Sequence, residues 1–87
     1  MFAYILRVHA APDEQAKEFF QRFKQEPGLL HAFDLQGMDD REDGVMLAVW
    51  ESREAAERYL NGAPLRQEVD AALPQVKRTM YEVWASK

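Results

Sequence analysis

The sequence contains no cysteine and only four glycines in 87 residues. Without thiols, the chain cannot form disulfides, a cysteine metal site or a thiolate nucleophile. The few glycines form no phosphate-binding loop and no dinucleotide fingerprint. No apolar stretch approaches the roughly 18 residues of a membrane-spanning helix, so we expect no membrane contact. These absences exclude several large classes of enzyme and favour a small globular protein.

Basic residues are also few, since 11 Lys and Arg stand against 15 Asp and Glu, for a net charge of -4. They are scattered among acids and form no stripe, so we expect no nucleic-acid partner. Hydrophobic residues are abundant at 47%, and the length fits one domain over residues 1–87. The apolar start has no preceding basic region and is interrupted by Arg7, which indicates a strand and not a signal peptide. We therefore expect a cytoplasmic protein.

The first third of the chain predicts a strand followed by an amphipathic helix. Residues 2–9 are rich in β-branched and aromatic side chains, as in a strand. The helix is expected to start with Pro12 as its first residue, followed by two acids, and to end at Pro27-Gly28. Apolar residues repeat on one helix face at Ala16, Phe19, Phe20 and Phe23.

The rest of the chain predicts two strands, two helices and a last strand. Residues 30–38 alternate in polarity, and the polar run 39–44 contains an Asp-Gly signal for a hairpin turn into residues 45–51. The remaining elements are a helix capped by Ser52 that stops at Asn61-Gly62, a helix from Pro64 that stops at Pro74, and a strand over residues 75–85.

This order of elements is that of an α+β, ferredoxin-like βαββαβ domain, an antiparallel sheet with the helices on one face. The strands at residues 2–9 and 45–51 are apolar on both of their faces. A solvated sheet face would instead alternate in polar residues. An uncovered apolar face usually marks an interface, and a two-fold dimer is the commonest solution. We therefore predict a homodimer that pairs through this face.

Three short stretches bring a family into view: PGLL at residues 27–30, VWES at 49–52 and AAERYL at 55–60. Together they resemble the antibiotic biosynthesis monooxygenase-like family of the dimeric α+β barrel superfamily. The resemblance implies a homodimer with a pocket in each subunit between the sheet and its helices. Characterised members include cofactor-free oxygenases of aromatic phenols and quinols, and haem-degrading enzymes.

The resemblance to the cofactor-free oxygenases covers part of their site. In those enzymes the tryptophan of the Trp-Glu-Ser motif lies in the pocket, with an asparagine four residues before it and a tyrosine six residues after it. Here Trp50 is kept, whereas Met46 and Ala56 stand at the other two positions. Two polar groups that would hold a phenolate are therefore replaced by apolar ones.

The haem-degrading branch fits less well. Its site has an asparagine on the first strand, a tryptophan on the second helix and a later histidine, where this chain has Leu6, Tyr59 and Val69. The resemblance therefore disfavours haem degradation, and we expect no cofactor. Neither histidine of the chain has a partner at a metal-like spacing, so we expect no metal site either.

Six residues are candidates for a site. Trp50 and Tyr59 could present an aromatic plane and a hydroxyl to a ligand, although both residue types at these positions also suit a core. His9 and His31 could act as general bases. We predict catalytic roles for Trp50, Tyr59, His9 and His31, and substrate contacts for Leu6, Met46, Trp50 and Tyr59.

These observations leave three functions open. The first is a small cofactor-independent monooxygenase that holds an aromatic phenol or quinol between sheet and helices and excludes water from it. The second is a non-catalytic dimeric protein that binds a small ligand or serves as an accessory. In the third, the side chains of the protein fill the pocket themselves.

Overall fold

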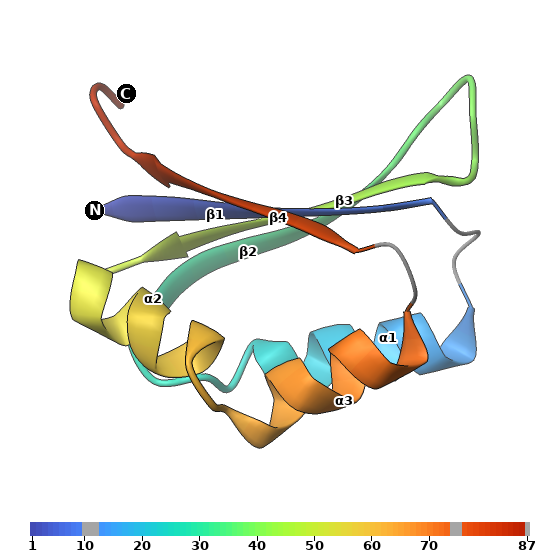
Figure 1. Cartoon of the computed structure of the whole chain (residues 1–87). Coiled ribbons are helices and arrows are strands. Elements are labelled where there is room, and N and C mark those ends of the chain that lie inside the picture. The colour runs from blue at the N-terminus through green and yellow to red at the C-terminus, as the bar shows by residue number, and fades with distance from the viewer. Residues whose placement is uncertain (10–12, 74–75, 87) are drawn as a thin grey trace.

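The computed structural model describes residues 1–9, 13–73 and 76–86. In chain order the elements are β1 (Phe2–His9), α1 (Glu14–Phe23), β2 (Leu29–Gln36), β3 (Asp43–Trp50), α2 (Arg53–Leu60), α3 (Pro64–Ala72) and β4 (Lys77–Glu82). The strands form one four-stranded antiparallel sheet in the order β2-β3-β1-β4. All the helices lie under one face of this sheet (Figure 1). The predicted ferredoxin-like α+β fold is confirmed.

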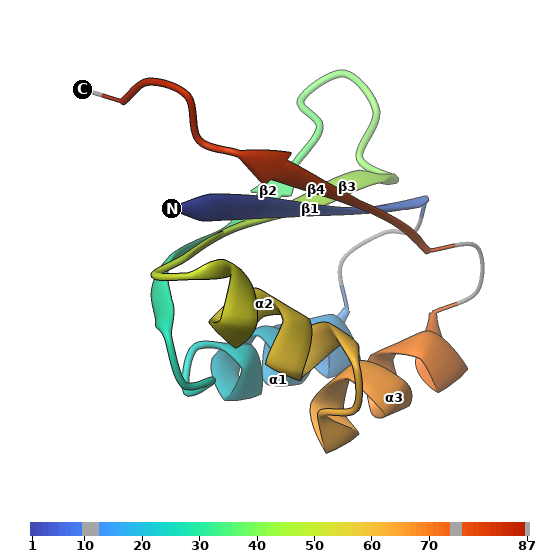
Figure 2. The same cartoon turned by 60° about the vertical axis from the view of Figure 1, so that its left-hand side comes forward.

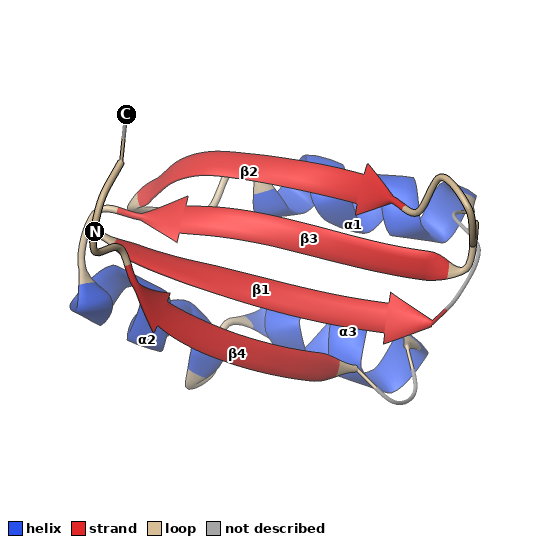
Figure 3. Ribbon diagram, turned by 90° about the horizontal axis from the view of Figure 1, so that it is seen from above, coloured by secondary structure: helices blue, strands red, loops and turns tan. Residues whose placement is uncertain are grey.

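The two faces of the sheet differ in what covers them. On β1, Tyr4 and Leu6 are buried toward the helices. Their partners on β3 are Ala48 and Met46, in that order. Because side chains alternate along a strand, Ile5 lies on the other face. Figure 3 views the sheet from that uncovered side, which we call the open face. The loop between β2 and β3 and the C-terminal tail both rise on this side (Figures 1 and 2).

Side-chain caps define where two of the helices begin. The Asp13 carboxylate accepts a hydrogen bond of 2.7 Å from the Ala16 amide, which makes Asp13 the N-cap of α1. We expected Asp13 inside the first turn, after Pro12, which itself lies outside the described residues. A carboxylate that satisfies a free N–H is favoured at the cap position, which explains the later start. At α2, the predicted N-cap Ser52 is confirmed, since its hydroxyl accepts from the Ala55 amide at 3.1 Å.

The hairpin between β2 and β3 is confirmed, but its turn was placed wrongly. Asp43 and Gly44, taken as the turn signal, belong to β3. The chain instead reverses over residues 37–42, where the Gly37 amide donates to the Asp43 carbonyl at 2.8 Å. The Asp40 carboxylate accepts from the Glu42 amide at 3.0 Å, and this local bond stabilises the turn without the Asp-Gly pair.

The last strand is shorter than its sequence pattern suggested. The structure places β4 at Lys77–Glu82, within the predicted span of 75–85. Residue 75 and the predicted helix stop Pro74 lie outside the described residues. Among the helices of the described residues, none is long and apolar enough to cross a membrane.

Gly28 ties the start of β2 to the end of β3. Its φ is +84°, a left-handed conformation that L side chains rarely adopt. A Cβ at this position would lie 2.5 Å from the Cβ of Ala55. The Gly28 carbonyl also accepts a hydrogen bond of 2.8 Å from the Glu51 amide. The Pro-Gly pair therefore has a structural reason, because only glycine allows this close approach of α2.

Candidate functional site

Four aromatic rings from both layers form the centre of the core: Tyr4, Phe23, Trp50 and Tyr59. Phe23 packs edge-on against Trp50 and Tyr59, with ring centroids 5.8 and 5.1 Å apart. Trp50 also lies 5.7 Å from Tyr59, and only 1% of its surface is exposed. Such edge-on pairs add about 0.5–1.5 kcal/mol each beyond the area that they bury. Trp50 is therefore surrounded by the protein itself.

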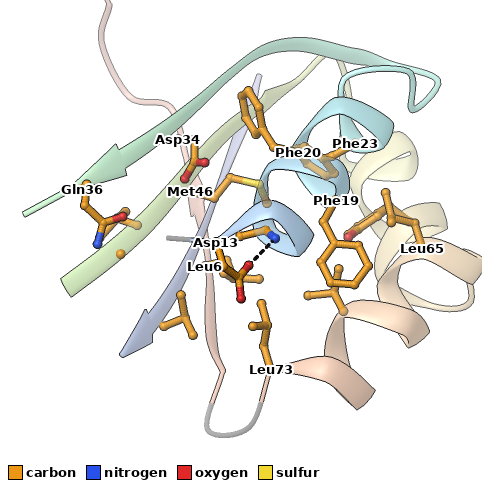
Figure 4. A pocket seen from close by; sticks show the side chains of 16 residues that line it. Leu6, Asp13, Phe19, Phe20, Phe23, Asp34, Gln36, Met46, Leu65 and Leu73 are labelled. Carbon is orange, nitrogen blue, oxygen red and sulfur yellow. Dashed lines mark hydrogen bonds between the residues drawn. The ribbon is translucent and has the colours of Figure 1, made fainter. Parts of the chain in front are cut away.

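A cavity of about 100 Å³ lies beside this cluster, between the helix-covered face of the sheet, α1 and α3 (Figure 4). For comparison, a buried cavity of about 150 Å³ can hold one benzene ring. The apolar lining includes Leu6, Val8, Ala16, Phe19, Phe20, Phe23, Met46, Leu65, Val69 and Leu73. The polar lining residues are Asp13, Asp34, Gln36 and Tyr59. The cavity is thus mainly apolar, and its volume is large enough for part of a small ring compound.

Burial divides the cavity into a floor and a mouth. Phe23, Tyr59 and Leu65 are buried, and they form the floor against the core. Asp13 and Asp34 are exposed, and they line the cavity from the start of α1 and from the edge strand β2. A ligand that enters here would place a polar end beside the two carboxylates and an apolar end against the rings.

Some polar groups of the lining already have hydrogen-bond partners within the protein, and others do not. The Asp13 carboxylate caps α1, and the Gln36 amide donates to the Arg41 carbonyl. For Asp34, no hydrogen bond or ion pair with a described residue is found. Partial loss of hydration beside the cavity raises the pKa of the Asp34 carboxyl above its usual value. Asp34 therefore offers a free acceptor at the mouth.

Tyr59 is the polar group of the floor. Only 3% of its surface is exposed, and its ring packs between Phe23 and Trp50. Burial raises the pKa of its hydroxyl, so that the group stays protonated and can donate a hydrogen bond. No partner for this hydroxyl is found among the described residues. Tyr59 thus combines a core ring that borders the cavity with a protonated hydroxyl.

No lysine, arginine or histidine is among the described residues that line the cavity. The half-buried Arg78 does not line the cavity, and its guanidinium donates to the Tyr4 hydroxyl and contacts the Asp70 carboxylate. Burial raises the pKa of the Tyr4 hydroxyl, while Arg78 acts in the opposite direction. Acceptors at the mouth and no cation in the lining favour a neutral ligand with an O–H or N–H donor over an anionic one.

Both histidines lie away from the cavity. His9 lies on the same face of β1 as Arg7 and Ile5, which is the open face. There its Nε2 contacts the Glu42 carboxylate at 3.1 Å. His31 is exposed and pairs with Val49, again on the open face. The structure therefore brings neither imidazole to the cavity of its own subunit. Among the described residues, no group of three His, Asp or Glu could hold a metal ion.

The structure brings together three of the predicted site residues. Leu6, Met46 and Tyr59 line one cavity, as expected from the helix-covered face. Trp50 lies behind them in the core and does not line the cavity. Asp34 was missed, although a signal was present. In the alternation of residues 30–38 it falls on the same side as Ala32, which places a carboxylate on the helix-covered face.

Comparison with known proteins adds a family and a set of similar folds. The family model for antibiotic biosynthesis monooxygenase matches residues 1–71. No curated protein matches the chain. SnoaB, a cofactor-independent oxygenase from Streptomyces nogalater, has 23% identity and a TM-score of 0.71, over 98% of this chain and 92% of SnoaB.

Two further solved structures are similar. A putative antibiotic biosynthesis monooxygenase from Deinococcus radiodurans has 18% identity and a TM-score of 0.80, over 100% of this chain and 96% of its own. A variant of MhuD with two manganese protoporphyrin IX per active site has 20% identity and a TM-score of 0.66, over 100% and 98%. At such identities these likenesses establish the fold alone.

Proposed function

The chain belongs to the antibiotic biosynthesis monooxygenase family, and we propose that it is a small cofactor-independent monooxygenase of a neutral phenol or quinol. One observation carries this proposal. The cavity is apolar within, has the free carboxylate of Asp34 at its mouth, and has no cationic side chain among its described lining residues. The fold of SnoaB, a cofactor-independent oxygenase, gives it further support.

The reaction needs little from the protein beyond binding, loss of a proton and exclusion of water. In its keto form, a phenolic ring carries a CH₂ group, which O₂ converts to a carbonyl. One oxygen atom enters the substrate and the other leaves as water, so the four electrons lost by the carbon are gained by O₂. The electron-rich substrate is itself the reductant. Leu6 and Met46 would contact its ring, and the Tyr59 hydroxyl would donate to an oxygen on it.

The size of the cavity limits the substrate. Its volume of about 100 Å³ is below the 300–1,000 Å³ of common ligand pockets. We propose that the apolar edge of one ring enters, and that the hydroxyl-bearing end and any further rings stay at the mouth beside α1. Met46 borders the cavity, and a flexible thioether side chain can adjust to a ring more readily than a branched one.

The cavity does not fit haem. The two propionates of haem are anionic and would meet Asp13 and Asp34 at the mouth. Leu6 and Val69, which stand where the haem-degrading branch has an asparagine and a histidine, are both buried and apolar. The similarity of the fold to MhuD therefore does not extend to these residues.

We further propose a homodimer that forms through the open face. This face carries Ile5 and Leu47, which are in register, beside the half-exposed Phe33 and Leu35 of β2. An exposed apolar sheet face of this kind is typical of an interface. The cytoplasmic location stays a prediction.

A non-catalytic ligand-binding role is the second candidate. Met46 and Ala56, at the positions of the missing asparagine and tyrosine, favour it: Met46 adds only apolar surface to the cavity, and Ala56 is fully buried in the core. In that case the protein would bind a phenol and release it unchanged. Loss of O₂ in the presence of substrate separates the two candidates.

The experiment is oxygen uptake with a panel of one- and two-ring quinols, with ¹⁸O₂ incorporation followed by mass spectrometry. Ala16→Trp fills the cavity from α1, and Ala71→Trp makes the same change at an exposed site of α3 outside the lining. We expect uptake by the wild type and by Ala71→Trp, and none by Ala16→Trp, with folding checked by circular dichroism. A folded wild type that consumes no oxygen across the panel contradicts the proposal.

A further inference from the structure

Asp34 is out of keeping with its surroundings. It lies on the helix-covered face of the edge strand β2, opposite Met46 of β3 and in the same row as Ala32. The rest of this face buries mainly apolar side chains. Figure 4 shows Asp34 beside Met46, facing the cavity from the β2 side. A charged group here loses part of its hydration, which has a cost unless another group replaces the lost water.

Three other aspartates of this fold have partners that explain them. Asp13 caps α1, Asp43 pairs with Arg7 at 3.3 Å, and Asp70 contacts Arg66 and Arg78. Asp34 has no such partner among the described residues. Partial loss of hydration raises the pKa of its carboxyl, and no charged group contributes to this shift. A carboxylate that is partly dehydrated, unpaired and directed at a cavity is suited to bind a hydrogen-bond donor on a ligand.

We propose that Asp34 binds the hydroxyl of the phenolic ligand and accepts its proton, an inference that rests on the proposed function. In this step the O–H bond of the ligand breaks and its electron pair stays on the ligand oxygen. A new O–H bond forms on the Asp34 carboxylate, so the pair keeps one negative charge throughout. The proton then passes to the reduced oxygen that leaves as water. Asp34 thereby takes the role that the sequence had suggested for a histidine.

The other titratable groups that line the cavity fit this assignment. Asp13, at the start of α1, is engaged by the Ala16 amide and is less available as an acceptor. Tyr59, on α2, lies on the buried floor and stays protonated, so it does not compete with Asp34 for the proton of the ligand. The strand β3 contributes Gly44 and Met46 beside Asp34, which carry no charge. Asp34 is therefore the one free proton acceptor among the described lining residues.

Binding of two probes tests the recognition step without any oxygen chemistry. The probes are 4-nitrophenol, kept neutral by a pH below its own ionisation, and 4-nitroanisole, which lacks the hydroxyl. Asp34→Asn keeps the shape of the side chain, and Asp39→Asn makes the same change at an exposed position of the β2–β3 loop. We expect Asp34→Asn to weaken 4-nitrophenol about tenfold and to leave 4-nitroanisole unchanged, since charge-assisted bonds are the stronger ones. Asp39→Asn should bind both probes as the wild type does.

Equal binding of 4-nitrophenol by the wild type and Asp34→Asn overturns the inference, as does failure of the wild type to bind either probe. For a quinol that is oxidised, the acid limb of the kcat/KM profile should disappear in Asp34→Asn, with kcat reduced about 10²–10⁴-fold. A retained acid limb overturns the role in proton transfer. Probe binding that depends on Asp34, without any oxygen uptake, supports the recognition role and contradicts the monooxygenase.

Discussion

Replacing Trp50 by alanine separates a role in the core from a role in contacting substrate. The ring is 1% exposed and makes two close aromatic contacts, with Phe23 and Tyr59. Truncation of a buried tryptophan to alanine costs about 3–5 kcal/mol. A domain of this size loses about 4–8 °C in Tm per kcal/mol, so the smallest expected loss is about 12 °C. The expected loss of about 3–5 kcal/mol is a large share of the roughly 5–15 kcal/mol that stabilises a small protein.

The assay is urea and thermal unfolding followed by far-ultraviolet circular dichroism, which does not depend on the deleted fluorophore. All variants are compared at one protein concentration, because dimer formation would make Tm concentration-dependent. Gln67→Ala on the exposed side of α3 is the control and should change stability by about 0.5 kcal/mol or less. A loss below about 1 kcal/mol for Trp50→Ala would refute the core role.

Three further predictions concern the turn, the mouth and the open face. Gly28→Ala should destabilise the protein by about 1–3 kcal/mol in urea unfolding, because alanine is strained at this φ and its Cβ would collide with α2; unchanged stability would contradict this. Asp34→Asn should stabilise the fold at pH 7. Because the pKa is raised in the folded state, the protonated carboxyl stabilises the fold below its ordinary unfolded-state pKa, and this stability is lost as pH rises through the folded-state pKa. The gain should shrink toward pH 4, and a gain that grows on acidification would disprove the burial argument. Leu47→Asp on the open face should sediment near the chain mass of 10.1 kDa, whereas the wild type and Gln67→Asp should sediment at about twice that mass.

Local patterns were sufficient to predict the fold because each element carries its own signals. The Ser52 cap and the apolar face of α1 depend on neighbours close in sequence. The prediction of the turn was wrong for a local reason as well. The Asp40 carboxylate accepts a hydrogen bond from the Glu42 amide in the loop before the Asp-Gly pair. Such competing side-chain bonds are hard to rank without coordinates.

The site was harder to predict because it depends on which face each side chain occupies. His9 shares its alternation with Ile5, and this alone would have placed it on the open face. The catalytic role predicted for the histidines stays a prediction. Whether Trp50 borders the cavity or lies behind it depends on how Phe23 and Tyr59 pack across two helices. Sequence spacing does not determine such a contact.

We propose that the cavity on the helix-covered face, and not the open face, binds the phenolic ligand. Methyl-resolved NMR during titration with 4-nitrophenol tests this claim most directly. We predict shifts of the cavity methyls of Leu6, Leu65 and Val69, with the open-face methyls of Ile5 and Leu47 unchanged. Shifts confined to Ile5 and Leu47, or no shifts at millimolar ligand, would contradict the account.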